Sequence, residues 1–298
     1  MKRFLKVFFT SLICFSLIII GGLFWLSGHS EGGIVNATDI FKIISNDKDQ
    51  RINVLVLGLE HERSDTIMVA SYNSKTKTAD IISIPRDTYI ERDGFVNSGN
   101  NKINSVYTVK GIEGLSEIIL NITGLKIDKF VTIDYDGVRA AVDAVDGVEV
   151  DVPFHMRYTD PYSDPPLDIN IEPGVQVIKG DRAMEFLRFR KTNYSGYSGY
   201  ADGDLGRIEA QQGFVKAAIK KALSFKLPIV VKEVFPYVNT DFSLTEATSL
   251  AMGSIGLSAE NVNFHTIPGT TQTKNNLSFY ILDRQATKDL VYSILEIE

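Results

Sequence analysis

The chain has 298 residues, of which 44% are hydrophobic and 23% are charged, and this composition excludes a wholly disordered chain. A single cysteine excludes an internal disulfide framework and a cysteine-rich zinc cluster. The net charge of −6 argues against a general nucleic-acid binder, and the length suits one large domain or two small ones.

The first predicted element is a membrane anchor at residues 7–26, a segment without a charged side chain. Twenty residues of α-helix span about 30 Å, which is the thickness of the hydrocarbon core of a bilayer. The basic residues Lys2, Arg3 and Lys6 precede it, so the positive-inside rule predicts residues 1–6 in the cytosol and the rest of the chain outside. A cleaved signal peptide would have a shorter apolar run and a small-residue cleavage site, so we expect an uncleaved, single-pass signal anchor.

After the anchor, residues 27–50 are polar and glycine-rich and predict a juxtamembrane linker. The lone cysteine, Cys14, falls inside the anchor, so the part outside the membrane contains none. We expect residues 51–298 to form one extracytoplasmic domain, because no further linker interrupts them.

Short apolar, β-branched runs alternate with helical patterns in this domain. We predict strands at residues 52–59, 66–72, 79–84, 130–133, 148–152 and 262–267. We predict helices at residues 115–122, 135–145, 182–187, 207–223, 245–255 and 284–294, and an irregular loop around the prolines at 161, 165 and 166. Mixed strands and helices over this length predict an α/β fold, a three-layer α/β/α sandwich with a mixed central sheet.

The common enzyme signatures are absent from the sequence, including the nucleophile elbow, the phosphate-binding P-loop and the paired-histidine zinc motif. Instead, arginine stands beside an acid near the ends of two predicted strands. Arg63 and Asp65 follow the first strand, and Arg86 and Asp87 follow the third. Ligand sites of α/β sheets lie at such strand ends, although either pair alone could be a surface ion pair.

A second basic group follows the middle of the chain. In extended chain, Arg188 and Arg190 share one face, with Phe189 on the other. Asp204 stands where a helix N-cap is expected, and Arg207 and Gln211 are one helical turn apart. Arginine forms forked hydrogen bonds to phosphate, and Mg²⁺ prefers carboxylate and phosphate oxygens. These residues therefore favour a site for a pyrophosphate with a divalent cation.

The motifs, taken in order, resemble the LytR-CpsA-Psr family over about residues 52–224. They are Arg63-Ser64-Asp65-Thr66, Ser83-Ile84-Pro85-Arg86-Asp87, Lys102-Ile103-Asn104, Arg188-Phe189-Arg190, and Asp204 to Gln212. The resemblance implies an extracytoplasmic phosphotransferase, typical of Gram-positive bacteria. Such an enzyme moves an anionic glycopolymer, a teichoic acid or capsule for example, from a polyprenyl-pyrophosphate carrier to the C6 hydroxyl of N-acetylmuramic acid in peptidoglycan.

The resemblance also implies the roles of single residues. The pyrophosphate would be bound by Arg63, Arg86, Arg188, Arg190, Arg207 and Gln211. Asp65, Arg86, Arg207 and Asp204 would be catalytic, and Asp65 with Glu60 would hold Mg²⁺ or Mn²⁺. Glu60 departs from the family, which usually has aspartate at that place. A longer departure is the tyrosine-, glycine- and serine-rich stretch at residues 192–203, interpreted either as a surface loop or as a lid or sugar-contact loop.

Two other functions remain open on sequence alone. The same residues would serve a pyrophosphatase, in which water replaces the sugar hydroxyl. A non-catalytic lipid-binding regulator of the envelope is the other alternative, although a six-residue cytosolic tail is too short to bind DNA.

Overall fold

The computed structural model describes residues 51–60, 63–92, 98–163, 166–201, 204–223 and 227–295, without the side chains of Glu60, Asp204, Leu205 and Ile208. The predicted tail, anchor and linker lie outside these residues. A search of the described part of the chain found no helix of the length and apolarity that a membrane crossing needs.

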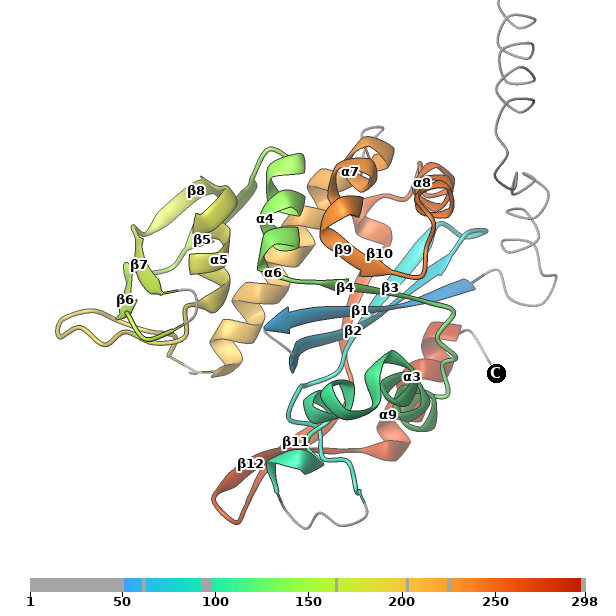
Figure 1. Ribbon diagram of the computed structural model, residues 1–298, viewed down its shortest axis with the longest axis horizontal. Coiled ribbons are helices and arrows are strands. Elements are labelled where there is room, and N and C mark those ends of the chain that lie inside the picture. Colours follow the sequence, from blue (N-terminus) through green and yellow to red (C-terminus); the bar gives the residue numbers. More distant parts are fainter. Residues whose placement is uncertain are drawn as a thin grey trace, which may run out of the picture. The chain divides into compact units, whose positions relative to one another are not determined.

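A mixed sheet forms the centre of the domain, as predicted (Figure 1). In the described residues its strands follow the order β10 (Val262–Thr266), β3 (Thr78–Ser83), β2 (Arg63–Asn73), β1 (Arg51–Glu60), β4 (Lys129–Ile133) and β9 (Val238–Thr240). β1 is parallel to β4 and antiparallel to β2. β3 is antiparallel to β2 and parallel to β10, and β9 is antiparallel to β4.

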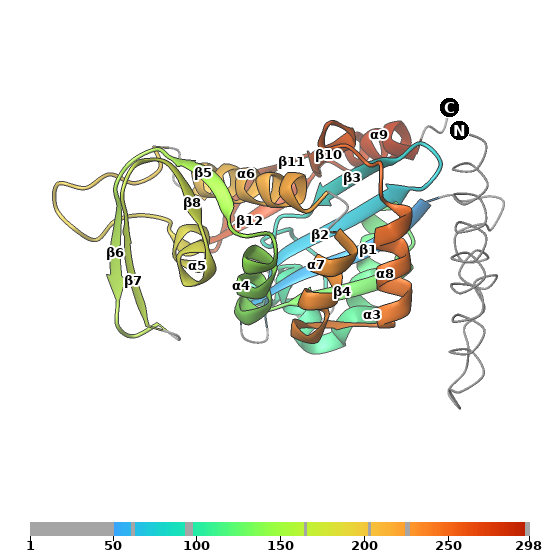
Figure 2. The same ribbon diagram turned by 90° about the horizontal axis from the view of Figure 1, so that it is seen from above.

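Helices cover both faces of this sheet, which gives the predicted three layers (Figures 1 and 2). One face carries α3 (Asn104–Thr123) and α9 (Arg284–Leu295). The other carries α4 (Tyr135–Ala144), α6 (Asp204–Ala222), α7 (Leu227–Val234) and α8 (Leu244–Gly253). Alternation of side chains along β3 explains the split, because Ile82 faces the first layer while Ile81 packs towards α6 and α8.

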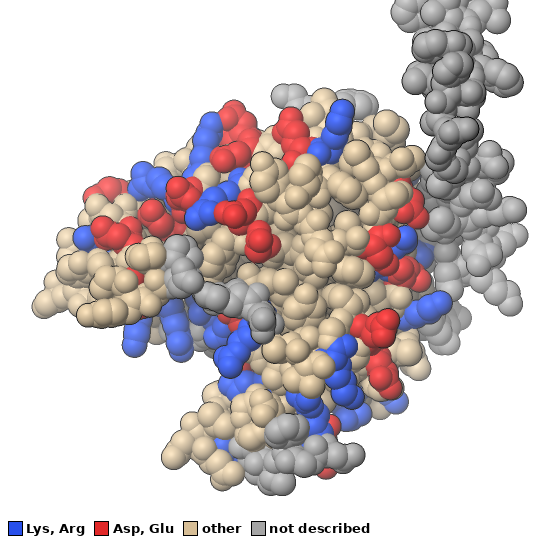
Figure 3. All heavy atoms as spheres, viewed as in Figure 1, with Lys and Arg blue, Asp and Glu red and all other residues tan. Residues whose placement is uncertain are grey.

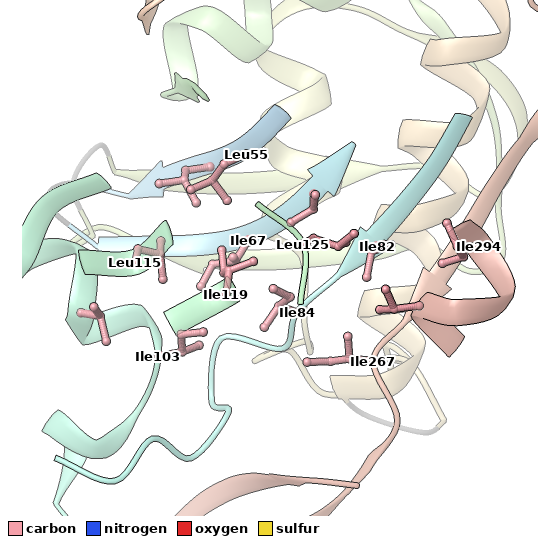
Figure 4. Close-up of a cluster of buried hydrophobic side chains, with 14 residues drawn as sticks. Leu55, Ile67, Ile82, Ile84, Ile103, Leu115, Ile119, Leu125, Ile267 and Ile294 are labelled. Carbon is pink, nitrogen blue, oxygen red and sulfur yellow. The ribbon is translucent and has the colours of Figure 1, made fainter. Parts of the chain in front are cut away.

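Fully buried aliphatic side chains from the sheet and α3 form the largest core (Figure 4). Leu55, Ile82, Leu115 and Ile119 have no exposed surface, and each such side chain contributes about 1.5–3 kcal/mol on burial.

α3 begins earlier than the predicted helix at 115–122. It starts at Asn104 and contains a kink at Gly111, whose φ of 63° lies in the left-handed region that glycine adopts at little cost. The kink explains the missed first half, because a mid-helix glycine interrupts the helical pattern. The helix ends at Gly124 (φ 75°), as expected.

The irregular loop that we predicted around the prolines lies between two paired strands that we did not predict. β6 (Met156–Asp160) pairs with β7 (Leu167–Ile171), and Pro161 and Pro166 stand at the two ends of the loop that joins them. β5 (Val148–Val152) pairs with β8 (Gly174–Ile178) outside the central sheet. Together with α5 (Gly180–Arg188) and α6, these two strand pairs form a second hydrophobic cluster, which includes Phe186, Phe189 and Phe214.

The last part of the chain adds a hairpin of β11 (Gly269–Lys274) with β12 (Leu277–Leu282), which we did not predict. β11 consists of glycine, threonine and other polar residues, so its hydrophobic signal is weak, whereas β12 is a mainly apolar run that we missed in the sequence.

Candidate functional site

One edge of the sheet collects most of the predicted site residues. β1, β3, β4 and β10 run in the same direction, and β2 runs against them. The carboxyl ends of those four strands and the start of β2 therefore share one edge. Arg63 and Asp65 lie at the start of β2, and Arg86 follows the end of β3.

Asp65 and Arg86 form the ion pair at the centre of this edge. Oδ1 of Asp65 lies 3.0 Å from an Nη of Arg86, and the two side chains are 27% and 35% exposed. Arg63 and Asp65 belong to β2 rather than to the loop before it, which corrects the predicted strand start at residue 66. Because neighbouring strand residues alternate, both side chains are accessible while Ser64 between them is buried.

The Lys102-Ile103-Asn104 motif holds the backbone that carries Arg86 through an ion pair and hydrogen bonds. Nζ of Lys102 lies 2.9 Å from Oδ1 of Asp87. The backbone N–H of Asn104 donates to the carbonyl of Arg86 at 3.3 Å, and that of Ile103 to the carbonyl of Thr88 at 2.9 Å. The motif therefore positions the arginine rather than extending the site.

β12 supports the same segment from the other side, a role that no sequence signal indicated. The N–H of Tyr280 donates to the carbonyl of Asp87 at 2.9 Å, and the N–H of Tyr89 donates to the carbonyl of Tyr280 at 2.8 Å. The ring of Phe279 lies edge-on to that of Tyr89, with centroids 5.4 Å apart. The C-terminal hairpin thus holds the backbone on which Arg86 stands.

The end of α5 brings the second basic group to the same edge. The guanidinium of Arg188 lies over the ring of Tyr135, 5.1 Å from its centroid, directly after the end of β4. Arg188 is the last residue of α5, so the extended conformation that we predicted begins only at Phe189. Phe189 is fully buried and Arg190 is exposed, as the predicted alternation requires.

α6 begins at Asp204, three residues before the predicted start at residue 207, so Asp204 is the first residue of the helix rather than the N-cap before it; its side chain is not described. The ring of Tyr200 packs on Gly206, where a Cβ would lie 2.7 Å from Cβ of Tyr200. Burial raises the pKa of Tyr200 to about 12, and the neighbouring charge of Arg207 opposes the rise. Arg207, in the first turn of the helix, is therefore close enough to this tyrosine to act on it electrostatically.

Two glutamines fix α6 against the rest of the site. Nε2 of Gln211 donates to the carbonyl of Leu187 at 2.7 Å, which ties α6 to the end of α5. Nε2 of Gln212 donates to Oγ1 of Thr266 at 3.2 Å, at the carboxyl end of β10. Gln211, which we predicted to bind the pyrophosphate, thus also has a structural hydrogen bond.

The arrangement makes one basic region at the sheet edge. Figure 3 shows Lys and Arg side chains gathered around a hollow between the β11–β12 hairpin and the part that contains α5 and β6–β7. Guanidinium groups at fixed positions bind phosphate oxygens with forked geometry, so this edge suits a phosphate-rich ligand.

The metal prediction rests on few oxygen donors. Within the described residues no group of three His, Cys, Asp or Glu side chains could hold an ion. Asp65 supplies a carboxylate. The backbone of Glu60, at the end of β1, lies opposite that of Arg63 in the β1–β2 pairing. Mg²⁺ commonly takes one or two carboxylates and completes its shell with phosphate oxygens and water. Asp65 could thus serve as one ligand of a Mg²⁺ ion whose shell is completed by substrate phosphate oxygens and water, while the side chain of Glu60 is not described.

Comparison with known proteins identifies the family of this chain and proteins of similar fold. The model of the LytR_cpsA_psr family matches residues 29–294. The chain is 26% identical over 263 residues to the polyisoprenyl-teichoic acid–peptidoglycan teichoic acid transferase TagV of Bacillus subtilis, a match that covers 85% of this chain and 65% of TagV, slightly less than two thirds. It is 27% identical over 298 residues to the transferase TagU of Oceanobacillus iheyensis, covering 91% of this chain and 87% of TagU. The crystal structure of B. subtilis TagV superposes with a TM-score of 0.67, covering 83% and 96% of the two chains.

Proposed function

The chain belongs to the LytR_cpsA_psr family, and on that premise we propose that it transfers an anionic glycopolymer, such as a teichoic acid, from a polyprenyl-pyrophosphate carrier to peptidoglycan. The observation that carries the proposal is the Asp65–Arg86 ion pair at the carboxyl ends of the parallel strands, with Arg188 held over Tyr135 just beyond the end of β4. Relatives named as transferases of teichoic acid to peptidoglycan support the substrate class.

In the proposed reaction the pyrophosphate of the carrier lies among Arg63, Arg86, Arg188, Arg190 and Arg207. Their charges stabilise the phosphoryl group in the transition state, and this electrostatic effect does most of the catalytic work. Asp65 with Glu60 would hold Mg²⁺, which supplies further neutralisation of phosphate charge.

The bond changes follow from the substrates. The C6 hydroxyl oxygen of N-acetylmuramic acid attacks the phosphorus that carries the glycopolymer. The bond from this phosphorus to the bridging oxygen breaks, and polyprenyl phosphate leaves. The hydroxyl proton passes to a carboxylate, Asp65 or Asp204, and a phosphodiester joins the polymer to the wall.

The carrier is a membrane lipid and the acceptor lies outside the cytosol. We therefore keep residues 7–26 as the anchor in this proposal, with residues 51–298 on the outer side.

A direct test combines the full-length chain in detergent with a lipid-pyrophosphate glycopolymer, Mg²⁺ and purified peptidoglycan, followed by mass analysis of the products. The proposal predicts a phosphodiester-linked muramic acid and release of polyprenyl phosphate. Release of phosphorylated polymer without attachment, with or without the acceptor, would instead identify a pyrophosphatase. Absence of any turnover across a Mg²⁺ titration would favour a binding protein or regulator.

A further inference from the structure

The tyrosine-rich segment between α5 and α6 is tied to β6 by hydrogen bonds, and it projects outward beyond β6 and β7 as a loop (Figures 1 and 2). Oγ1 of Thr192 donates to the carbonyl of Arg157 at 2.7 Å. The side chain of Asn193 accepts from the N–H of Thr159 at 3.2 Å and donates to its carbonyl at 2.7 Å. These bonds run from two side chains of the segment to the backbone of β6, and they fix the start of the segment against that strand.

The docking holds two tyrosine rings at the surface. Tyr194 and Tyr197, here called the tyrosine pair, are 38% and 40% exposed, with ring centroids 6.1 Å apart. The hydroxyl of Tyr194 lies 2.7 Å from Oγ1 of Thr159, and the guanidinium of Arg157 lies 4.9 Å from its ring centroid. The ring of Tyr197 meets that of His155 edge-on, with centroids 4.9 Å apart. Two partly exposed aromatic rings are thus fixed before any ligand arrives, which lowers the entropy cost of binding.

The charges around the tyrosine pair differ from those of the sheet edge. Arg157 is ion-paired with Asp168, so its charge is already compensated. The pKa of Asp168 is lowered by hydrogen bonds from Arg157 and Thr159, and its carboxylate stays charged at neutral pH. Glu172 lies 3.5 Å from Nε2 of His155. Arg157 is thus neutralised, and the carboxylates of Asp168 and Glu172 lie beside the residues that hold the pair, which disfavours an anionic polymer at this place.

Uncharged sugar rings fit such a surface. Their C–H faces pack on the electron-rich faces of aromatic rings, while neighbouring carboxylates, amides and hydroxyls accept and donate hydrogen bonds to sugar hydroxyls. In the sequence, the segment follows Arg190 and precedes Asp204 and Arg207. It therefore connects the two stretches of chain that carry the arginines of α5 and α6.

We propose that the tyrosine pair, with Arg157 and His155 behind it, binds the uncharged glycan chain of peptidoglycan next to the transfer site. The identity of this ligand as the acceptor rests on the proposed function. The anionic donor belongs to the arginine-rich edge, and the acceptor glycan belongs to the tyrosine pair.

The test measures binding apart from turnover. Full-length protein in detergent is titrated, without donor lipid, with peptidoglycan glycan strands freed of their stem peptides, whose exposed lactyl carboxylates have been amidated so that the strands carry no charge. Replacing both rings, Tyr194→Ala with Tyr197→Ala, should weaken binding by about fivefold or more, since each aromatic contact contributes about 0.5–1.5 kcal/mol. Tyr292→Ala on α9, where the side chain is 52% exposed, is the matched control and should bind as the unaltered protein does. Tyr197→Phe keeps the ring and should also bind normally.

The outcomes separate this inference from the proposed function. Equal binding by the double variant and the unaltered protein, with both folded by thermal melting, overturns the inference. A double variant that loses affinity for a soluble anionic glycopolymer, rather than for the glycan strands, overturns it as well. Tyrosine-dependent glycan binding in a protein that transfers no polymer would sink the proposed function and leave the binding surface standing.

Discussion

Substituting Arg86 tests whether this arginine mainly stabilises the fold or mainly stabilises the transition state of the proposed reaction. The Asp65–Arg86 pair is about a third exposed, and such pairs contribute about 0.2–1 kcal/mol to stability. Arg86→Ala should therefore lower the free energy of unfolding by no more than about 1 kcal/mol. If the guanidinium stabilises charge on the transferring phosphoryl group, its loss costs about 2.7–4 kcal/mol in the transition state, or a 10²–10³-fold lower kcat.

The two quantities are measured on the same preparations, stability by urea unfolding and transfer by the mass-spectrometric product assay. Lys129→Ala is the matched control, because Lys129 forms a 3.3 Å ion pair with Glu246 at the start of β4, on the opposite edge of the sheet. The control should lose similar stability and no transfer activity. Full transfer by Arg86→Ala, or a loss no larger than its unfolded fraction explains, would refute the assignment of Arg86 to the site.

Three further predictions concern the support of the site and of the sheet. Phe189→Ala, which empties a fully buried aromatic site, should cost about 3–5 kcal/mol in urea unfolding and lower transfer, because Phe189 fixes the segment that bears two of the arginines. Gly137→Ala should lower the free energy of unfolding by about 1–3 kcal/mol, because the added Cβ would lie 2.5 Å from Cγ1 of Ile133 and 2.7 Å from the carbonyl oxygen of Tyr237. An unchanged free energy of unfolding would contradict the close packing at the start of α4. The backbone N–H of Ser243 lowers the pKa of Glu246, so its carboxylate stabilises the fold above the ordinary value of 4.5 and this contribution is lost as the pH falls through the lowered pKa. Glu246→Gln should thus lower the melting temperature at pH 7 and change it little at pH 3. A difference in melting temperature that does not depend on pH would contradict the role given to the hydrogen bond from Ser243 to this carboxylate.

The strands of the central sheet that were predicted from sequence share a strong local signal. β1 and β3 are runs of β-branched and aliphatic residues with buried side chains on both faces, and such runs can be recognised as strands from the sequence alone. β6 and β7 carry mainly partly exposed or alternating side chains, and their stability comes from pairing with each other across a turn. Pairing between separate segments leaves little trace in either segment alone, so these strands were missed.

The same reasoning explains what was predicted of the site. Arginines and acids at strand ends could be identified because β1 and β3 were recognised, and the topology then brings Asp65 to Arg86. The ring of Tyr135 below Arg188 could not be identified, because it depends on how α5 packs against α4. The hydrogen bonds from β12 to the segment that carries Arg86 could not be identified either, because they join residues almost two hundred positions apart in the sequence.

The site draws on two separate hydrophobic clusters, and this has a consequence for its rigidity. Ile84 and Ile103, beside Arg86, belong to the cluster between the sheet and α3. Phe189 belongs to the cluster formed by α4, α5, α6 and the β5–β8 and β6–β7 strand pairs. The hydrogen bond from Gln212 of α6 to Thr266 at the end of β10 joins this group of elements to the central sheet. Because phosphoryl transfer depends on the positions of fixed charges, such contacts between the two groups help to set the distance between the two halves of the arginine group and hence its fit to a pyrophosphate.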